Sequence, residues 1–353
     1  MKQGLLYTGL IVIGIAIVVG IFTYVGADKI ISNLQTIGLI GFLVYFGTSL
    51  VVVALPIIGL HIILHSHNIK TLFWHTAIGQ LIGNAIGFIT PSMYLGGEPL
   101  KAHYIGDLYK TSKTKVFSIG IFGKFQELSS LLFFIYVGTL IMIIEAGSLP
   151  LPAGIWTLLL VVDISLGLFV IFAVRSIIKN NPVISNVIIW ISRRGIFRKH
   201  IEKLIPKITR IEEMIYQTFK HDWKTGIVAY TFNFLSIVVA FIKPAVFFFF
   251  LYKYTNILSL TEIALIFTLS QILLVFHITP GCVGIFEGGQ IWIFNLIGIN
   301  MGDAASYLLV YRFVDLLITG GGIYLAIHYN LVKFVSARLE TIDSSGEENN
   351  PNN

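Results

Sequence analysis

The amino-acid sequence predicts an all-α polytopic membrane protein with about six full spans and two re-entrant, broken helical hairpins arranged as an inverted repeat. Three observations support this prediction. Hydrophobic residues make up 56% of the 353 positions and charged residues only 12%, whereas a water-soluble globule needs a charged surface. Apolar segments recur along the chain at the length that crosses a bilayer. Two of these eight segments are interrupted by the same motif, Ile-Thr-Pro followed seven residues later by Glu.

Six apolar segments are long and continuous enough to span, because a helix needs about 20 residues to cross about 30 Å of hydrocarbon. The first follows a lone Lys2 and lacks a small-residue cleavage site, so we expect a retained helix rather than a signal peptide. We expect one transmembrane domain over 1–338, followed by a disordered tail over 339–353 that is rich in Asn, Ser and Glu. The six segments are 4–25, 37–64, 116–144, 153–174, 224–251 and 304–328.

Two further apolar segments, 72–98 and 259–298, are each interrupted in their second half. Proline lacks a backbone donor and glycine is a poor helix former, so neither segment is expected to be one continuous helix. The Ile-Thr-Pro motif with its later glutamate occurs once in each segment. The residues that break the two segments are Pro91, Gly96, Gly97, Pro280, Gly281 and Gly284.

The distribution of basic residues predicts how the chain crosses the cell membrane. The loop 175–224 carries eleven Lys and Arg against four acids, and such loops stay on the cytoplasmic side. Counting spans from this loop places the N-terminus, the lysine-rich region 101–115 and the C-terminus on that side too. Segment 72–98 then enters from the cytoplasm and segment 259–298 from the outside. This arrangement is typical of transporters whose substrate binds near the midplane; the alternative is two full spans with kinks.

Charged side chains within apolar segments are costly, so each is a candidate functional residue. Glu98 and Lys101 could together hold a zwitterionic or phosphate-bearing headgroup, or simply neutralise each other across one helical turn. Glu287 is flanked by glycines that allow close backbone approach, at a point where a new helix can begin. Arg312 has a planar guanidinium group that suits phosphate, but it could also pair along its own helix with Asp315.

Further polar residues within or next to the apolar segments are expected to contact the substrate or to form ion pairs. Asn84 and the hydroxyl residues Thr90 and Thr279 lie close to the breaks, and we expect them to contact the substrate. Lys124 and Glu127 have the spacing of a structural ion pair. Lys243 has no partner nearby in the sequence, so it could reach Asp163 or Glu287, or line the transport path.

The chain contains none of the common enzymatic motifs: no phosphate-binding loop, no nucleophile elbow and no zinc-protease helix. The single cysteine, Cys282, excludes an intrachain disulfide and a multi-cysteine metal site. We therefore expect no metal, no cofactor and no nucleic-acid partner.

Taken together, these motifs resemble the integral membrane region of the lysylphosphatidylglycerol synthase and flippase family, which includes many uncharacterised membrane proteins. In bifunctional members this region precedes a soluble aminoacyl-transferase domain and is implicated in moving the lipid product between leaflets. Here the chain ends soon after the last span, so the resemblance implies a stand-alone translocator rather than a lipid-modifying enzyme. One departure is Lys101, where the family more often has arginine; a point-charge contact remains, but a bidentate one does not. The resemblance rests on Asn84, Thr90-Pro91, Gly96-Gly97-Glu98, Lys101, Pro280-Gly281, Gly284, Glu287 and Tyr311-Arg312.

The function expected from these features is translocation of a lipid headgroup, most simply that of an anionic or zwitterionic phospholipid. Glu98, Lys101, Glu287 and Arg312 are expected to line a midplane cavity, with one hairpin gating each face. A membrane-embedded transferase acting on a lipid or polyprenyl-phosphate carrier is one alternative, but its metal-binding carboxylates would be paired, whereas the acids here are scattered. A scaffold subunit is another alternative, which would not need polar breaks within the membrane.

Overall fold

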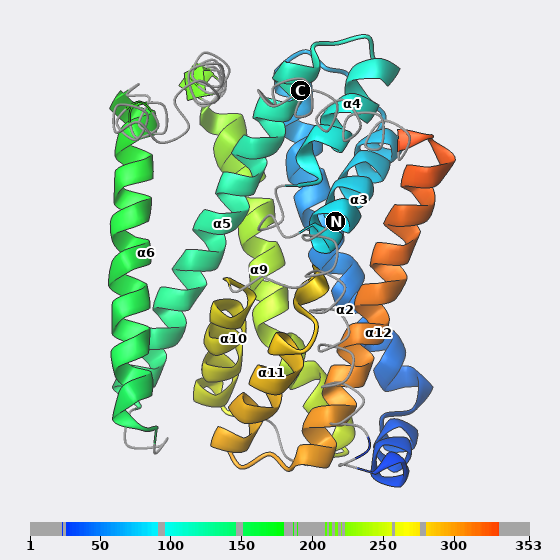
Figure 1. Ribbon diagram of the computed structural model, residues 1–353, viewed down its shortest axis with the longest axis vertical. Helices are drawn as coiled ribbons and strands as arrows, with labels where there is room; N and C mark the ends of the chain where they lie inside the picture. Colours follow the sequence, from blue (N-terminus) through cyan, green and yellow to red (C-terminus); the bar gives the residue numbers. More distant parts are fainter. Residues whose placement is uncertain are drawn as a thin grey trace, which may run out of the picture.

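The computed structural model describes residues 26–90, 96–145, 151–179, 223–255, 258–275 and 280–331, with a few isolated positions elsewhere. All regular structure within these ranges is helical (Figure 1). In the first half of the chain the helices are α2 (Ala27–Ser66), α3 (Phe73–Ile89), α4 (Glu98–Leu108), α5 (Lys113–Ile144) and α6 (Ala153–Lys179). They continue with α9 (Trp223–Leu251), α10 (Leu260–Val275), the short 3-10 helix η1 (Pro280–Cys282), α11 (Ile285–Leu296) and α12 (Met301–His328).

Four of the described helices are long and apolar enough to cross a membrane: α2, α5, α9 and α12. They contain the predicted spans 37–64, 116–144, 224–251 and 304–328. The predicted span 153–174 lies within α6, where the stretch Ala153–Ser165 is apolar but shorter. The protein is therefore a polytopic, multi-pass membrane protein.

Several sequence-based predictions fall outside the described residues. These are the span 4–25 apart from Thr23, most of the basic loop 175–224 and the tail 339–353. The helix α2 extends beyond the predicted span 37–64, because it begins at Ala27. Gly38 (φ 63°, ψ −177°) interrupts the helical backbone there and joins two helical stretches, a conformation that glycine adopts readily.

The first predicted hairpin consists of α3 and α4, which pack against each other. The predicted end at 98 is wrong, because Glu98 begins α4 and this second limb continues to Leu108. The sequence did not reveal this limb because α4 contains charged residues, among them Lys101, His103 and Asp107. Gly97 allows the two limbs to meet, since a Cβ atom there would lie 1.7 Å from the carbonyl oxygen of Gly83.

The second hairpin consists of α10, η1 and α11, and its bounds agree closely with the predicted segment 259–298. Its break lies where it was predicted, from Pro280 to Gly284. Gly281 (φ 63°) and Gly284 (φ 88°) adopt the left-handed backbone region, which is accessible to glycine at little cost.

The two hairpins lie toward opposite ends of the long helices (Figure 1). The α3–α4 hairpin occupies the upper half of the view and the α10–α11 hairpin the lower half. Each is packed into its own hydrophobic cluster, one that includes Leu64, Ile82 and Ile105 and one that includes Phe248, Leu265 and Phe294. The hairpins meet where η1 packs on α3. At this contact a Cβ atom on Gly281 would lie 2.7 Å from the ring of Phe88.

Candidate functional site

The start of α4 carries a fully buried ion pair. Glu98 Oε2 lies 2.6 Å from Lys101 Nζ, and the two residues are only 1% and 2% exposed. Lys101 Nζ also donates a hydrogen bond of 2.9 Å to Gln80 Oε1 on α3. The amide of Gln80 in turn donates to Asn84 Oδ1 at 3.1 Å. The predicted residues Asn84, Glu98 and Lys101 thus form one connected polar cluster, together with Gln80.

Space for this ion pair comes from a glycine on the neighbouring helix. A Cβ atom on Gly120 of α5 would lie 2.2 Å from Glu98 Oε2 and 3.1 Å from Lys101 Cε. Any larger residue at this position would displace the carboxylate. A polar site is therefore built into the packing of α3, α4 and α5.

A second ion pair lies beside the first, on α5. Lys124 Nζ lies 2.8 Å from Glu127 Oε2, which confirms the predicted pair. Lys101, Lys124 and Glu127 border one small polar pocket, together with Gln80 and Asn233. This pocket presents two ammonium groups and a carboxylate, and its volume of about 10 Å³ is that of a single water molecule.

The second hairpin carries the other principal ion pair. Arg312 Nε of α12 donates to Glu287 Oε1 of α11 at 2.5 Å, so Arg312 pairs across helices with Glu287. The second carboxylate oxygen of Glu287 accepts the backbone N–H of Gly284 at 2.6 Å and so caps the start of α11. Glu287 is only 4% exposed, so this carboxylate is held from two sides.

Arg312 also binds the broken segment of the hairpin directly. Its Nη1 atom donates to the carbonyl oxygen of Gly281 at 2.9 Å, and Nη2 lies 3.5 Å from the carbonyl oxygen of Cys282. The guanidinium group is stacked 4.9 Å from the centre of the Phe286 ring. A single side chain therefore binds both the backbone of the hairpin break and the carboxylate at the start of α11.

The Glu287–Arg312 pair borders an apolar cavity of about 490 Å³. The remaining lining is hydrophobic and comes from α2 and α12, including Leu34, Phe42, Leu309 and Phe313. Ligand sites typically have this size and this combination of an apolar wall with a few polar groups.

Lys243 lies near the same pair, between aromatic rings. Its Nζ atom is 4.9 Å from the centre of the Tyr45 ring and 5.0 Å from that of Tyr311. The acid that interacts with it electrostatically is Asp315, rather than Asp163 or Glu287. Asp315 also interacts with Arg312, so α12 contributes both an acid and a base to this region.

The structure thus places the four principal charged residues in two pairs, one at each hairpin; Lys101 borders one pocket and the Glu287–Arg312 pair borders another. Thr90 ends α3, where its hydroxyl donates to the carbonyl oxygen of Ile86 at 2.8 Å. Pro91 and Thr279 lie outside the described residues. Within the part of the chain that the structure describes, no group of three or more His, Cys, Asp or Glu could hold a metal ion.

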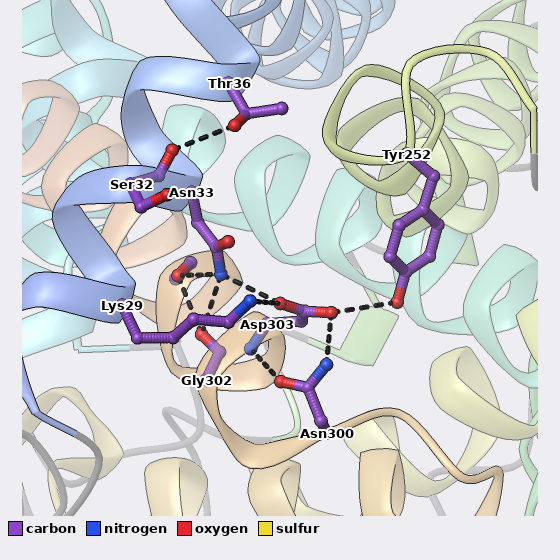
Figure 2. A network of polar contacts seen from close by, with 9 residues as sticks. Lys29, Ser32, Asn33, Thr36, Tyr252, Asn300, Gly302 and Asp303 are labelled. Carbon is purple, nitrogen blue, oxygen red and sulfur yellow. Dashed lines mark hydrogen bonds and ion pairs between the residues drawn. The ribbon is translucent and has the colours of Figure 1, made fainter.

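One polar network was not anticipated from the sequence. Asp303, at the start of α12, accepts hydrogen bonds from Asn33 Nδ2 at 2.8 Å, from Asn300 Nδ2 at 2.5 Å and from the Tyr252 hydroxyl at 3.3 Å. Lys29 Nζ lies 3.7 Å from the same carboxylate. Figure 2 shows that this network joins the beginnings of α2 and α12 to the residue that follows α9. The sequence signal was Asn300 followed three residues later by an acid, a common helix start.

Together, the helices, the broken hairpins and the buried ion pairs define a multi-pass membrane protein with two polar sites inside an apolar bundle. Residues 11–322 match the lysylphosphatidylglycerol synthase TM region family, and the chain belongs to this family. It is also similar to a UPF0104 membrane protein from Methanocaldococcus jannaschii, with 25% identity over 317 residues, which cover 87% of this chain and 90% of that protein. No solved structure matches the chain. The resemblance inferred from the motifs is thereby confirmed.

Proposed function

We propose that this protein translocates a phospholipid with an anionic or zwitterionic headgroup between the two leaflets of the cell membrane. The observation that carries the proposal is the position of Arg312, whose guanidinium group binds Glu287 and the broken backbone of the second hairpin at once. Membership of a family named for a lipid-modifying membrane enzyme also supports a lipid substrate.

The chemistry of Arg312 explains how a headgroup could act on the hairpin. A guanidinium group presents its donors in a planar fork that matches phosphate as well as carboxylate. A lipid phosphate can therefore take the place of Glu287 on the arginine, while Glu287 keeps the backbone N–H of Gly284 as its hydrogen-bond donor. The exchange would loosen the contacts to Gly281 and Cys282, and the hairpin break would then be free to change shape.

The first hairpin would offer the corresponding site on the other face. Lys101 and Lys124 supply cationic groups for a phosphate, and Glu98 and Glu127 supply carboxylates for an amine. With the N-terminus, the basic loop and the C-terminus in the cytoplasm, this site would open inward and the Glu287–Arg312 site outward. The headgroup would move between them past the contact of η1 with α3, while the acyl chains stay in the bilayer.

The test is lipid translocation in vesicles that contain the purified protein and a phospholipid with a fluorescent label. Arg312→Ala and Glu287→Gln should slow translocation about 10-fold or more, which corresponds to about 1.4 kcal/mol in the barrier, and Arg312→Lys should be intermediate. Lys70→Ala is the matched control, because Lys70 is an exposed cation between α2 and α3. Unchanged rates in Arg312→Ala and Glu287→Gln would contradict the proposal, as would recovery of a chemically altered lipid, which would indicate a transferase.

A further inference from the structure

A long apolar groove runs between α2 and α12. The cavity of about 490 Å³ beside Arg312 adjoins a second one of about 450 Å³, because both are lined by Leu34, Phe42 and Val310. We call the two together the α2–α12 groove. Its walls are formed almost entirely by aliphatic and aromatic side chains, so its ligand must be an apolar chain rather than a headgroup.

The length of the groove matches one leaflet of a bilayer. Along α12 the lining extends from Ala305 to Leu316, which corresponds to about 17 Å at the helical rise of 1.5 Å per residue. One leaflet contributes about 15 Å to a hydrocarbon core of about 30 Å. A single acyl chain in its ordinary orientation would therefore fill the groove from end to end.

The surface around the groove has the character of a membrane-facing surface. Ile40 of α2 is 71% exposed, and on α12 Phe313 is 52% and Leu317 48% exposed. Large apolar side chains exposed side by side in a helix of spanning length face lipid. The bilayer itself therefore supplies acyl chains at the opening of the groove.

One end of the groove carries a cation at the level of the helix ends. Lys29 lies just before the lining residue Ile31 on α2, and its side chain crosses to α12 beside Asp303 (Figure 2). Half of this side chain is exposed, at 54%, and the distance to Asp303 is a loose 3.7 Å. The ammonium group can therefore also contact an anion at the membrane surface, where a phospholipid in normal orientation places its phosphate.

We propose that the α2–α12 groove binds one acyl chain of a phospholipid whose phosphate lies next to Lys29. The transported lipid docks at this groove, in the leaflet that surrounds the start of α12. Binding in the groove follows from the groove itself. Only the claim that the bound lipid is also the transported lipid rests on the proposed function. Arg312 and Glu287, at the deep end, are then positioned to receive the headgroup once it leaves the surface.

The experiment uses vesicles that contain the full-length protein and a phospholipid with a photoactivatable group on its acyl chain, with the crosslinked residues mapped by mass spectrometry. Crosslinks should concentrate on the α2–α12 groove, and Leu309→Trp, which fills it, should reduce them about 5-fold or more. Leu317→Trp is the matched control, since Leu317 lies on the same helix outside the groove lining. Lys29→Gln should reduce crosslinking and Lys29→Arg should restore it.

Two results would overturn binding in the groove, a third would show that the bound lipid is not the transported one, and a fourth would affect only the proposed function. Equal loss of crosslinks in Leu309→Trp and Leu317→Trp would mean that lipid merely coats the surface. Lipid crosslinks on residues 4–25 in place of the groove residues would mean that the acyl chain binds elsewhere. Loss of crosslinks in Leu309→Trp with unchanged translocation would show that the bound lipid is not the transported one. Normal crosslinking to a protein that translocates no lipid would contradict the proposed function and leave the groove as a lipid-binding site.

Discussion

At the scale of single residues, the buried acids of both sites are stabilised by neighbouring cations. Glu98 meets Lys101 one helical turn away, whereas Glu287 meets Arg312 from another helix. An isolated charge in an apolar interior costs several kcal/mol, and a partner with good geometry compensates for much of this cost. The ion pairs are thus needed for stability even before any substrate binds, so mutational tests must separate folding from transport.

A charge-removal series at the first pair makes this separation. Glu98→Gln leaves Lys101 buried without its carboxylate and should lower the free energy of unfolding by about 3–5 kcal/mol. The double variant Glu98→Gln with Lys101→Met should recover most of the stability, because neither charge is then left alone, yet it should not restore lipid translocation. Thermal unfolding in detergent and the vesicle assay measure the two effects. A double variant as unstable as the single one would show that the pair does not act as a unit.

At the scale of helices, glycines decide how closely the broken elements can pack. Gly97 at the start of α4 touches the backbone of α3 at Gly83, and Gly322 of α12 approaches the carbonyl oxygen of Leu81 on α3. Small residues at helix contacts are typical of membrane proteins, because close backbone packing replaces the hydrophobic effect as the force between helices. Close packing of the α3–α4 hairpin therefore requires glycine, which has no side chain, at these helix contacts.

Substitution of Gly97 tests this dependence. Gly97→Ala would place a Cβ atom 1.7 Å from the carbonyl oxygen of Gly83, so the limbs must separate, and we expect a loss of about 1–3 kcal/mol or more of stability. Gly320→Ala in α12 is the control, because nothing lies within 4 Å of a Cβ atom there. It should stabilise the helix by about 0.5–1 kcal/mol. Thermal unfolding distinguishes the two, and equal melting temperatures would contradict the close contact.

At the scale of the whole molecule, the two hairpins occupy opposite ends of the long helices (Figure 1). The contact of η1 with α3 brings the two breaks together. This geometry is compatible with an inverted repeat, in which each hairpin enters the bilayer from its own face. Whether the chain takes this topology can be tested by labelling from each side of the membrane.

Cysteine labelling with an impermeant reagent provides that test. Lys70→Cys, between α2 and α3, should react only from the cytoplasmic side, and Met301→Cys, at the start of α12, only from the outside. Both parent residues are exposed, whereas the native Cys282 is 0% exposed, so the unmodified protein serves as the blank. Reaction of both sites from one side would contradict the opposed hairpins.

Much of the architecture could be predicted from the sequence because it depends on local properties. The length of an apolar segment and the presence of proline or glycine sufficed to find the described spans and both breaks. Charged residues in α4 concealed the second limb of the first hairpin, which is held by its contacts with α3 and α5 rather than by its own hydrophobicity. The polar residues Asp28, Lys29 and Asn33 likewise concealed the early start of α2.

By itself, the sequence determined the class of protein and its family resemblance, and it predicted which charged residues form the candidate sites. Only the tertiary structure decided which of them meet. Local spacing offered Asp315 as a possible partner for Arg312, and the fold also brings Glu287 to it from a separate helix. Local spacing also gave no indication of the groove between α2 and α12, because its two walls are far apart in the chain. Membrane insertion is decided by the apolarity of each segment alone, whereas a binding site depends on contacts between segments that only folding brings together.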